Sequence, residues 1–356
     1  MKKIIISVTN DLTTDQRVHK VADSLYNHGF SVCLVGRSGD HMNPRNYQYV
    51  RFNMIFHHGF FFYLEFNIRL FFFLLFKNFD IVLSNDLDTL LANFFVSKIK
   101  RKQLVYDTHE LFPEVPELIN RPITRSVWLL IERFCLPRIN DIYTVSASIA
   151  HYYYKKYSIE MSLIRNYPLY RKLNYTQSNE NYKKIIYQGA VNKDRGVKLM
   201  IESMKHLENV KLYIVGGGDL LDVLMSYTKD LNLQNKVNFL GKIPFSKLHV
   251  ITDNADLGLS FEEDTCLAYR YALPNKVFDY ISSEIPILLS DLPEFKKIIQ
   301  KYNVGMILKS RKPKDVADQI TQILSINKSE FLSELKVAKK DFCWENEEKE
   351  LLSFFT

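Results

Sequence analysis

Residues 1–35 read MKKIIISVTNDLTTDQRVHKVADSLYNHGFSVCLV and decide the fold class, because they hold one complete strand–helix–strand unit. The apolar run Ile4–Val8 predicts a strand, and Thr14–Asn27 carries apolar residues at helical spacing up to the helix-ending Gly29. Phe30–Val35 predicts the next strand. Parallel pairing is the economical arrangement, since parallel strands need a long crossover such as this helix.

The same alternation of apolar runs and helical patterns continues along the chain and is interrupted once. Further strands are predicted at 81–84, 104–106 and 142–145, then at 185–188, 212–215, 237–240, 257–260, 287–290 and 305–308. The polar, aperiodic stretch 168–184 between the two sets predicts an interdomain linker. We therefore predict an α/β protein with two Rossmann-like, doubly wound parallel-sheet domains, 1–167 and 185–335. The strandless end, 336–356, is expected to be helical and to pack back on the first domain.

The composition excludes several classes of protein. The chain has 356 residues, 47% of them hydrophobic and 24% charged, which suits two buried cores and excludes disordered and fibrous proteins. A net charge of +7 fits anionic small ligands or an anionic membrane surface. No basic block is interleaved with stacking aromatics, so no nucleic-acid partner is predicted. A short apolar run after Met1-Lys2-Lys3 and four widely spaced cysteines indicate a cytoplasmic protein without a signal peptide.

Polar side chains follow three predicted strands of the first domain, at the edge where ligands bind in open α/β sheets. The candidates are Asn10, Asp11, Arg17, Asn85, Asp86, His109 and Glu110. The alternative for 9–17 is an ordinary helix start capped by Thr13 or Thr14, and acids at 86 and 88 would also favour a helix N-terminus. His109 lies between Asp107 and Glu110, which indicates a site that handles charge, against the alternative of a structural histidine.

Two glycine-containing turns follow predicted strands of the second domain. The first, Gly189–Gly196, leads into a helix and carries Lys193 and Arg195, which can meet an anion at the helix N-terminus. The second, Gly216–Gly218, permits a close backbone approach, and a simple tight turn is the alternative.

The most informative stretch is Tyr269–Ile281, which reads YRYALPNKVFDYI. Pro274 near a helix start leaves the first-turn amides free. Lys276 lies in that turn, where a cation is unfavourable unless an anion is bound. Asp279, one turn later, can accept hydrogen bonds from a ribose diol. A phosphate and a diol within one helical turn are what a nucleoside diphosphate presents, so the stretch predicts that ligand.

These motifs resemble the retaining GT-B glycosyltransferases of family 4, and the resemblance runs from Asn10 to Trp344. The matching residues are Asp107–Glu110, Gly189 with Arg195-Gly196, Gly216–Gly218, Phe239-Leu240-Gly241, and Leu273-Pro274-Asn275-Lys276 followed by Asp279. The chain departs from the family at Tyr271, where a Glu usually holds the donor sugar, and at Ala190, where an Arg often follows the glycine.

The resemblance implies two domains that face a central cleft, and transfer of a sugar from a nucleotide-diphosphate sugar to a glycan or lipid-linked acceptor with retention of configuration. It implies catalytic roles for His109, Arg195 and Lys276. The implied donor-binding residues are Gly189, Gly217, Gly241, Tyr271, Pro274, Asn275 and Asp279, and the implied acceptor-side residues are Asn10, Asp11, Arg17, Asn85, Asp86 and Glu110. No metal ion or other cofactor is expected, because cationic side chains and helix amides would neutralise the leaving diphosphate.

The implied setting is cell-surface polysaccharide synthesis. Two alternatives remain open at this point. One is another GT-B enzyme, an epimerase or a phosphorylase. The other is a sugar-nucleotide-binding protein without transferase activity.

The segment Phe56–Lys77 is unusually rich in phenylalanine. It has the length of a membrane span, but Glu65, Asn67 and Arg69 near its middle argue against spanning. We expect residues 67–76 to form a core helix that buries most of its circumference. We expect Phe60, Phe61, Phe62 and Tyr63 to form an exposed apolar patch that meets a bilayer or a lipid-linked acceptor, which predicts a cytoplasmic protein at the inner face of the membrane.

Overall fold

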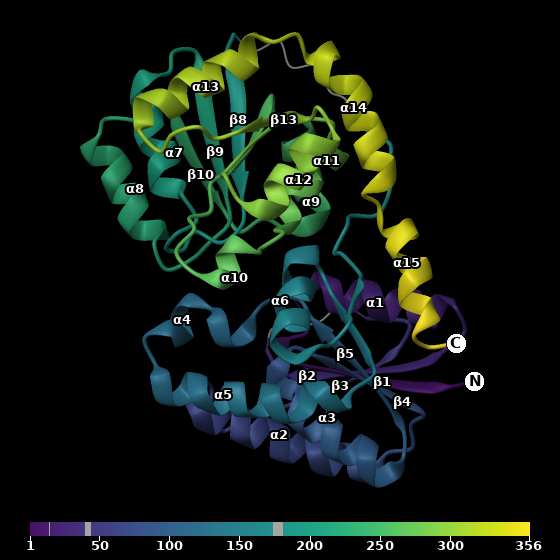
Figure 1. The fold of residues 1–356 in the computed structure, drawn as a ribbon. Helices are drawn as coiled ribbons and strands as arrows, with labels where there is room; N and C mark the ends of the chain where they lie inside the picture. Colours follow the sequence, from purple (N-terminus) through teal and green to yellow (C-terminus); the bar gives the residue numbers. More distant parts are fainter. Residues whose placement is uncertain (14, 40–43, 174–180) are drawn as a thin grey trace. The chain divides into compact units, whose positions relative to one another are not determined.

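The computed structural model describes residues 1–13, 15–39, 44–173 and 181–356. The chain forms two compact units, one of residues Met1–Asn166 with Glu347–Thr356 and one of Tyr167–Asn346. Each unit has its own parallel sheet with helices around it (Figure 1). The predicted α/β class with two doubly wound parallel sheets is therefore confirmed.

The first unit has a sheet in the order β3-β2-β1-β4-β5-β6-β7, in which every pair is parallel. Its strands are β1 (Lys3–Asp11), β2 (Ser31–Arg37), β3 (Gln48–Phe52), β4 (Ile81–Asn85), β5 (Gln103–Thr108), β6 (Asp141–Thr144) and β7 (Ser162–Leu163). The sequence did not predict β3 and β7. Both are edge strands without a fully buried residue, so neither has the apolar run that marks a central parallel strand.

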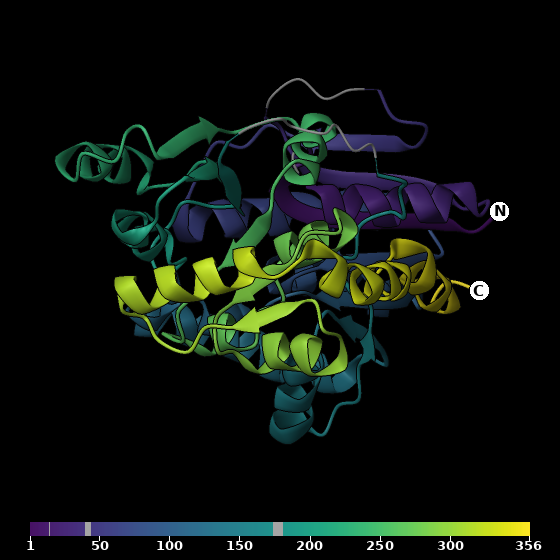
Figure 2. The same cartoon turned by 90° about the horizontal axis from the view of Figure 1, so that it is seen from above.

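The helices of the first unit lie against this sheet. They are α1 (Gln16–Asn27), α2 (Gly59–Phe76), α3 (Leu87–Lys100), η1 (Phe112–Glu114), α4 (Pro116–Ile119), α5 (Pro122–Cys135), η2 (Leu136–Arg138), α6 (Ala147–Tyr157) and most of α15 (Trp344–Ser353). Helix α3 packs against both α2 and α5 (Figure 1). The two chain ends lie together in this unit, as Figures 1 and 2 show. A hydrogen bond joins them, from Lys2 Nζ to the carbonyl oxygen of Phe355 at 3.1 Å.

The helix α2 differs from the prediction of a core helix. It buries one row of residues at four-residue spacing, Phe62, Phe66, Leu70 and Leu74, and exposes much of its remaining circumference. The expected exposed patch is right for Phe60 and Phe61, but wrong for Phe62, which is 6% exposed, and for Tyr63, which packs on Trp128. Among the described residues α2 is long and apolar enough to cross a membrane, yet its buried row attaches it to the sheet.

The second unit has a sheet in the order β10-β9-β8-β11-β12-β13, again with parallel pairs. Its strands are β8 (Lys183–Gln188), β9 (Val210–Val215), β10 (Val237–Gly241), β11 (Leu257–Ser260), β12 (Ile287–Leu289) and β13 (Gly305–Ile307). Its helices are α7 (Val197–Ser203), η3 (Met204–His206), α8 (Leu221–Asp230), α9 (Phe245–Asp253), α10 (Leu267–Arg270), α11 (Asn275–Ser282), α12 (Pro293–Lys301), α13 (Pro313–Ser325) and α14 (Lys328–Asp341).

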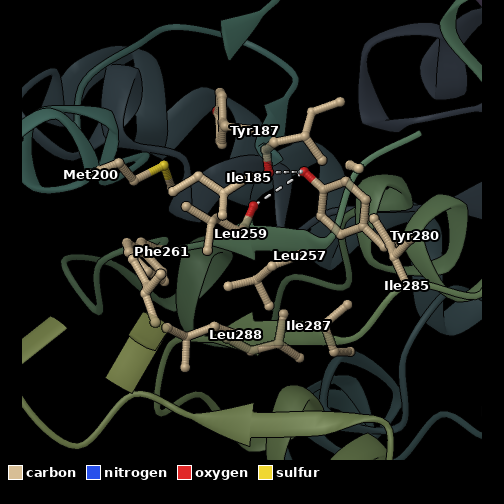
Figure 3. Packing of buried hydrophobic residues seen from close by; sticks show 14 of the residues in the cluster. Ile185, Tyr187, Met200, Leu257, Leu259, Phe261, Tyr280, Ile285, Ile287 and Leu288 are labelled. Atoms are coloured by element: carbon tan, nitrogen blue, oxygen red, sulfur yellow. Dashed lines mark hydrogen bonds between the residues drawn. The ribbon is translucent and has the colours of Figure 1, made fainter. Parts of the chain in front are cut away.

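A tyrosine fixes α11 across the middle of this second sheet. The Tyr280 hydroxyl donates to the carbonyl oxygens of Ile186 and Leu259 at 3.3 and 3.2 Å (Figure 3). It also accepts from the Gln188 backbone N–H at 3.0 Å. Its ring lies directly over Gly258, where any Cβ would collide with it. The contact holds α11 in one register over β8 and β11, and so sets where Lys276 and Asp279 lie.

Replacement of Tyr280 by Phe should lower the stability of the second unit while leaving its shape intact. The change leaves the buried Gln188 backbone N–H without an acceptor. A buried donor without a partner lowers the free energy of unfolding by about 1–3 kcal/mol. Urea unfolding should show the midpoint shift. Tyr26→Phe on the exposed surface of α1 is the control and should leave the midpoint unchanged. Equal midpoints for Tyr280→Phe and wild type would contradict the anchoring role.

Candidate active site

In the first unit, the ends of β4 and β5 bring an imidazole between two carboxylates. His109 Nε2 lies 2.8 Å from Asp86 Oδ2, and His109 Nδ1 lies 3.7 Å from Asp107 Oδ1. Burial opposes the charged imidazole, but the Asp86 and Asp107 carboxylates outweigh it and raise the His109 pKa well above its ordinary value. His109 is therefore an imidazolium near neutral pH. It can donate hydrogen bonds and stabilise negative charge, but it cannot accept a proton.

Arg17, which was predicted on the acceptor side of the cleft, lies in the interior. Its guanidinium donates to both oxygens of Asp107, at 2.8 and 2.9 Å, and to the carbonyl oxygen of Ile164 at 3.0 Å. Arg17 is 5% exposed and Asp107 is fully buried. The pair joins α1 to β5 and to the chain after β7, so Arg17 positions Asp107, and through it His109, rather than forming a cleft wall.

Asn85 also lies in the interior, since it is fully buried and its amide donates to the carbonyl oxygen of Ser7 at 3.1 Å. This bond joins β4 to β1. The prediction that Asn85 faces a ligand is therefore wrong, because the last residue of a central strand points into the sheet's packing.

The acids at the start of α3 bond to residues of other segments, and the side chain of the N-cap residue Asp86 makes no capping hydrogen bond. Asp86 accepts from His109 and has a backbone φ of 55°, a left-handed value that few non-glycine residues adopt. Asp88 is 7% exposed and accepts from the Thr9 hydroxyl. Burial and the neighbouring Asp86 carboxylate raise the pKa of Asp88 to about 8. Asp88 therefore keeps a proton near neutral pH, in the same group of side chains as the Asp86–His109 pair.

The polar turn after β1 is ordered by its own acids. Asp15 caps α1, because its carboxylate accepts from the Val18 N–H at 3.2 Å; Thr13 is not the cap, and Thr14 lies outside the described residues. Asn10 donates to Asp15 at 2.9 Å, and Asp11 accepts from the Thr13 N–H at 3.1 Å. Asn10 and Glu110 are exposed, so both are accessible to a ligand of this unit.

In the second unit, a buried carboxylate lies between two cations. Glu262 is fully buried and follows β11, and it accepts from Lys276 Nζ at 2.6 Å and from the Ser260 hydroxyl at 2.7 Å. Arg195 Nη1 lies 3.9 Å from the same Glu262 oxygen, and its guanidinium lies over the Tyr269 ring at 4.5 Å. Burial would raise the Glu262 pKa, but Lys276 outweighs burial and the pKa is lowered.

This cluster changes the argument about Lys276. The sequence suggested that a cation in the first turn of α11 requires a bound anion, and the structure shows that Glu262 supplies a negative charge within the protein. No role was assigned to Glu262 from the sequence. The cue that was available is that Glu262 follows an apolar strand directly and so lies at the sheet edge.

Lys276 also reaches the first glycine turn. A Cβ at Gly189 would lie 3.6 Å from Lys276 Nζ, and the ammonium lies over the Tyr187 ring at 4.2 Å. The exposed Ala190 is the next residue, where the family resemblance implies an Arg. Lys276 therefore places a cation from α11 beside Gly189, where Ala190 supplies no positive charge.

The glycine turns bring three loops of the second unit together. Gly216 has a φ of 140°, and a Cβ there would collide with the Gly189 carbonyl oxygen. Gly196 has a φ of 73°, and a Cβ there would collide with the Phe261 carbonyl oxygen. The Gly241 carbonyl oxygen accepts from the Gly216 N–H at 2.8 Å. The next residue, Gly217, lies against the Lys242 side chain.

Asp279 is held in one orientation by a relay of hydrogen bonds. Gln188 Nε2 donates to Asp279 Oδ2 at 2.7 Å, and the Thr252 hydroxyl donates to Gln188 Oε1 at 2.8 Å. Pro274 immediately precedes α11, and Asn275 is its exposed first residue. Tyr271 is the C-cap of the short helix α10, so Tyr271 and Asp279 belong to separate helical segments.

The site residues thus form two groups, one in each unit. Within the described ranges, no group of three or more His, Cys, Asp or Glu side chains is arranged to hold a metal ion. The second-unit group offers two cations, glycine backbone and an oriented carboxylate. That combination suits a ligand with a phosphate and a diol.

Two sequence-family models match the chain, and together they cover most of it. Residues 172–339 match Glycosyl transferases group 1, and residues 15–166 match Glycosyltransferase Family 4. The chain therefore belongs to the family 4 glycosyltransferases, which confirms the resemblance found in the sequence. A curated relative, an uncharacterized glycosyltransferase of Methanocaldococcus jannaschii, is 26% identical over 197 residues; the match covers 52% of this chain and 48% of that protein, about half its length.

Solved structures are similar over the whole chain. Sucrose-phosphate synthase from Thermosynechococcus elongatus superposes with a TM-score of 0.80 at 15% identity and covers 100% of this chain and 98% of that one. An Anabaena protein in complex with UDP-glucose gives 0.74 at 12% identity, with coverage of 100% and 99%. A lipopolysaccharide outer core galactosyltransferase gives 0.69 at 14% identity, also with 100% and 99%. At these identities the likeness shows the GT-B fold.

The raised pKa of Asp88 predicts a pH dependence of stability. The folded-state pKa, about 8, lies above the ordinary value of 3.8, so the folded protein keeps a proton that the unfolded chain releases. The stability that comes from the protonated Asp88 carboxyl is present at low pH and is lost as pH rises towards 8. Asp88→Asn, which keeps a neutral polar group, should therefore gain stability relative to wild type between pH 5 and 8, by at most about 1.4 kcal/mol per pH unit.

The measurement is urea unfolding of wild type and Asp88→Asn across that pH range. Asp80→Asn is the control, since Asp80 lies at the opposite edge of the sheet and its pKa is lowered by the Lys3 N–H and Lys102. Parallel stability curves for wild type and Asp88→Asn would show that Asp88 is ionised in the folded protein.

Proposed function

We propose that the protein transfers a sugar from a nucleoside-diphosphate sugar to a glycan or lipid-linked acceptor, with retention of configuration. The observation that carries the proposal is the cluster of Lys276, Arg195 and Glu262 beside the glycine turns, with Asp279 one turn further along α11. We further propose that the protein acts in cell-surface polysaccharide synthesis, in the cytoplasm at the inner face of the membrane.

The second unit would bind the donor. Lys276 and Arg195 face the diphosphate, together with the first amides of α11, and stabilise the negative charge that grows on the leaving phosphate. Asp279, oriented by Gln188, accepts from the ribose hydroxyls. The Glu262 carboxylate keeps both cations in place and is a positioning residue, since it lies beneath them.

The first unit would bind the acceptor and support the transferred sugar. The acceptor oxygen bonds to the anomeric carbon on the face from which the phosphate oxygen leaves, and the acceptor proton passes to that phosphate oxygen. The charged state of His109 supports this route, because an imidazolium cannot take the proton itself. Because its two N–H groups face Asp86 and Asp107, His109 would instead act through its positive charge, beside the sugar hydroxyls and the leaving phosphate.

A thermal-shift screen of UDP, GDP, ADP and CDP tests the donor assignment first. One diphosphate should raise the melting temperature, and UDP comes first because a structural neighbour was solved with UDP-glucose. The matching nucleotide sugars are then tested for release of diphosphate with and without acceptor. Binding without any hydrolysis or transfer would favour a sugar-nucleotide-binding protein.

The position of Lys276 predicts that its charge can be supplied from position 190. Lys276→Met should lower turnover about 10²-fold, because a cation at the leaving diphosphate is lost. Adding Ala190→Arg should raise turnover at least tenfold again, since position 190 is exposed and adjacent to Gly189. Glu262→Gln is included in both variants so that no buried carboxylate is left without its partner. A folded variant that Ala190→Arg fails to rescue would show that Lys276 serves Glu262 alone.

His109→Ala should separate transfer from donor binding. Because His109 belongs to the first unit, the melting-temperature shift with the nucleoside diphosphate should persist while transfer falls by about 10²-fold or more. His109→Gln is the matched variant, since it keeps a donor but not the charge, and should be intermediate. Equal loss of nucleotide binding and transfer would indicate that His109 only maintains the fold.

A further inference from the structure

The helix α2 is apolar on two opposite sides. One row, Phe62, Phe66, Leu70 and Leu74, is 0–6% exposed and packs on the sheet. A second row at four-residue intervals lies on the other side and is 42–80% exposed: Phe60, Leu64, Ile68, Phe72 and Phe76. At 1.5 Å per residue this outer row runs about 24 Å along the helix. The fold needs only the inner row.

Helix α3, which packs against both α2 and α5, and α5 itself carry further exposed apolar side chains. On α3, Phe95 and Ile99 are 42% and 60% exposed, one turn apart. On α5, the residues Ile123, Val127, Leu130 and Phe134 repeat at helical spacing and are 40–82% exposed. The Phe134 ring joins the two helices, since it lies 6.1 Å from the Phe95 ring. We call the exposed rows of α2, α3 and α5 the outer apolar surface.

Positive charge gathers at the C-terminal ends of these three helices. Lys100 Nζ donates to the Lys77 carbonyl oxygen at 2.6 Å and Lys98 Nζ to that of Arg138 at 3.4 Å, so the ends lie together. The exposed cations there are Lys77, Lys98, Arg101, Lys102 and Arg138. Acids at this end include Asp80, which pairs with Lys102 at 2.9 Å, and Asp141, which accepts from Gln103 Nε2 at 2.8 Å. The charge beside the outer apolar surface is therefore complementary to an anionic partner.

We propose that the outer apolar surface docks on an anionic lipid bilayer. The exposed phenylalanine, leucine and isoleucine side chains enter the boundary between headgroups and acyl chains, and the cations at the helix ends contact lipid phosphates. The helix α2 lies on the bilayer and does not span it, because its inner row stays in the core of the unit. This deepens the proposed function by naming the surface through which a lipid-linked acceptor is reached.

Inner contacts connect this surface to the acceptor-side residues. Asn67 Nδ2 on α2 donates to the Asp88 carbonyl oxygen at 2.7 Å, at the start of α3. The Tyr63 ring lies 5.1 Å from Trp128, which in turn lies 5.0 Å from Phe112, three residues after His109. The helix that meets the lipid therefore also fixes the segments that carry Asp86, Asp88 and His109.

Co-sedimentation with vesicles tests the proposal. Wild type should pellet with vesicles of phosphatidylcholine and phosphatidylglycerol, and much less with phosphatidylcholine alone. Ile68→Ser/Phe72→Ser/Phe76→Ser should reduce the bound fraction at least tenfold. Lys98→Gln/Arg101→Gln should reduce it and weaken its dependence on salt. The control is Val223→Ser/Val250→Ser, which removes exposed apolar side chains from the second unit and should bind like wild type.

Two further measurements keep the outcome unambiguous. The melting temperature of each variant, with and without the nucleoside diphosphate, should match wild type, so that lost vesicle binding is separated from lost folding and from a failed donor assignment. Light scattering after gel filtration detects the competing occupant, a second copy of the chain. Absent vesicle binding by wild type, an unchanged fraction for the triple variant, or a dimer that this variant dissociates would overturn the proposal.

Discussion

The second unit depends on the neutralisation of one buried carboxylate. Glu262 has no access to water, and an ionised carboxylate there is unfavourable unless cations and hydrogen bonds surround it. Lys276 comes from α11, Arg195 from the turn after β8, and Ser260 from the end of β11. One charge therefore fixes three segments at the edge of the sheet. It also keeps two cations close together that would otherwise repel each other.

The first unit uses a similar arrangement with one additional carboxylate. There two cations, Arg17 and His109, share the buried Asp107, and His109 has Asp86 as its second partner. The Arg17 pair is internal and serves the fold, whereas His109 keeps part of its side chain, 26%, exposed. The result is a site with a fixed positive donor in the first unit and a site with two fixed cations in the second. Neither arrangement has to reorganise when a negative group approaches, which is the condition for electrostatic stabilisation of a transition state.

The sequence predicted the parts of this structure that follow from periodicity and missed those that depend on distant contacts. Central strands such as β1 and β8 are marked by apolar runs, while β3 and β7 at the sheet edge are half-exposed and carry no such run. The candidate site residues that follow strands could be predicted, because ligands of open α/β sheets bind at the carboxyl ends of the strands. Their partners were not, because Glu262 meets Lys276 across 14 positions and Arg17 meets Asp107 across 90.

The helix α2 shows why hydropathy alone could not decide its environment. Its polar residues argued against a membrane span, but each is used within the unit. Glu65 accepts from the Ile55 and Phe56 N–H groups, Asn67 donates to the Asp88 carbonyl, and Arg69 pairs with Glu65 at 2.7 Å. Little is left on the outer side except Phe, Leu and Ile. A sequence selected only for folding in water would place polar residues there, because exposed apolar area contributes nothing to stability and favours aggregation. The second apolar row is therefore better explained by a surface that is covered when the protein works.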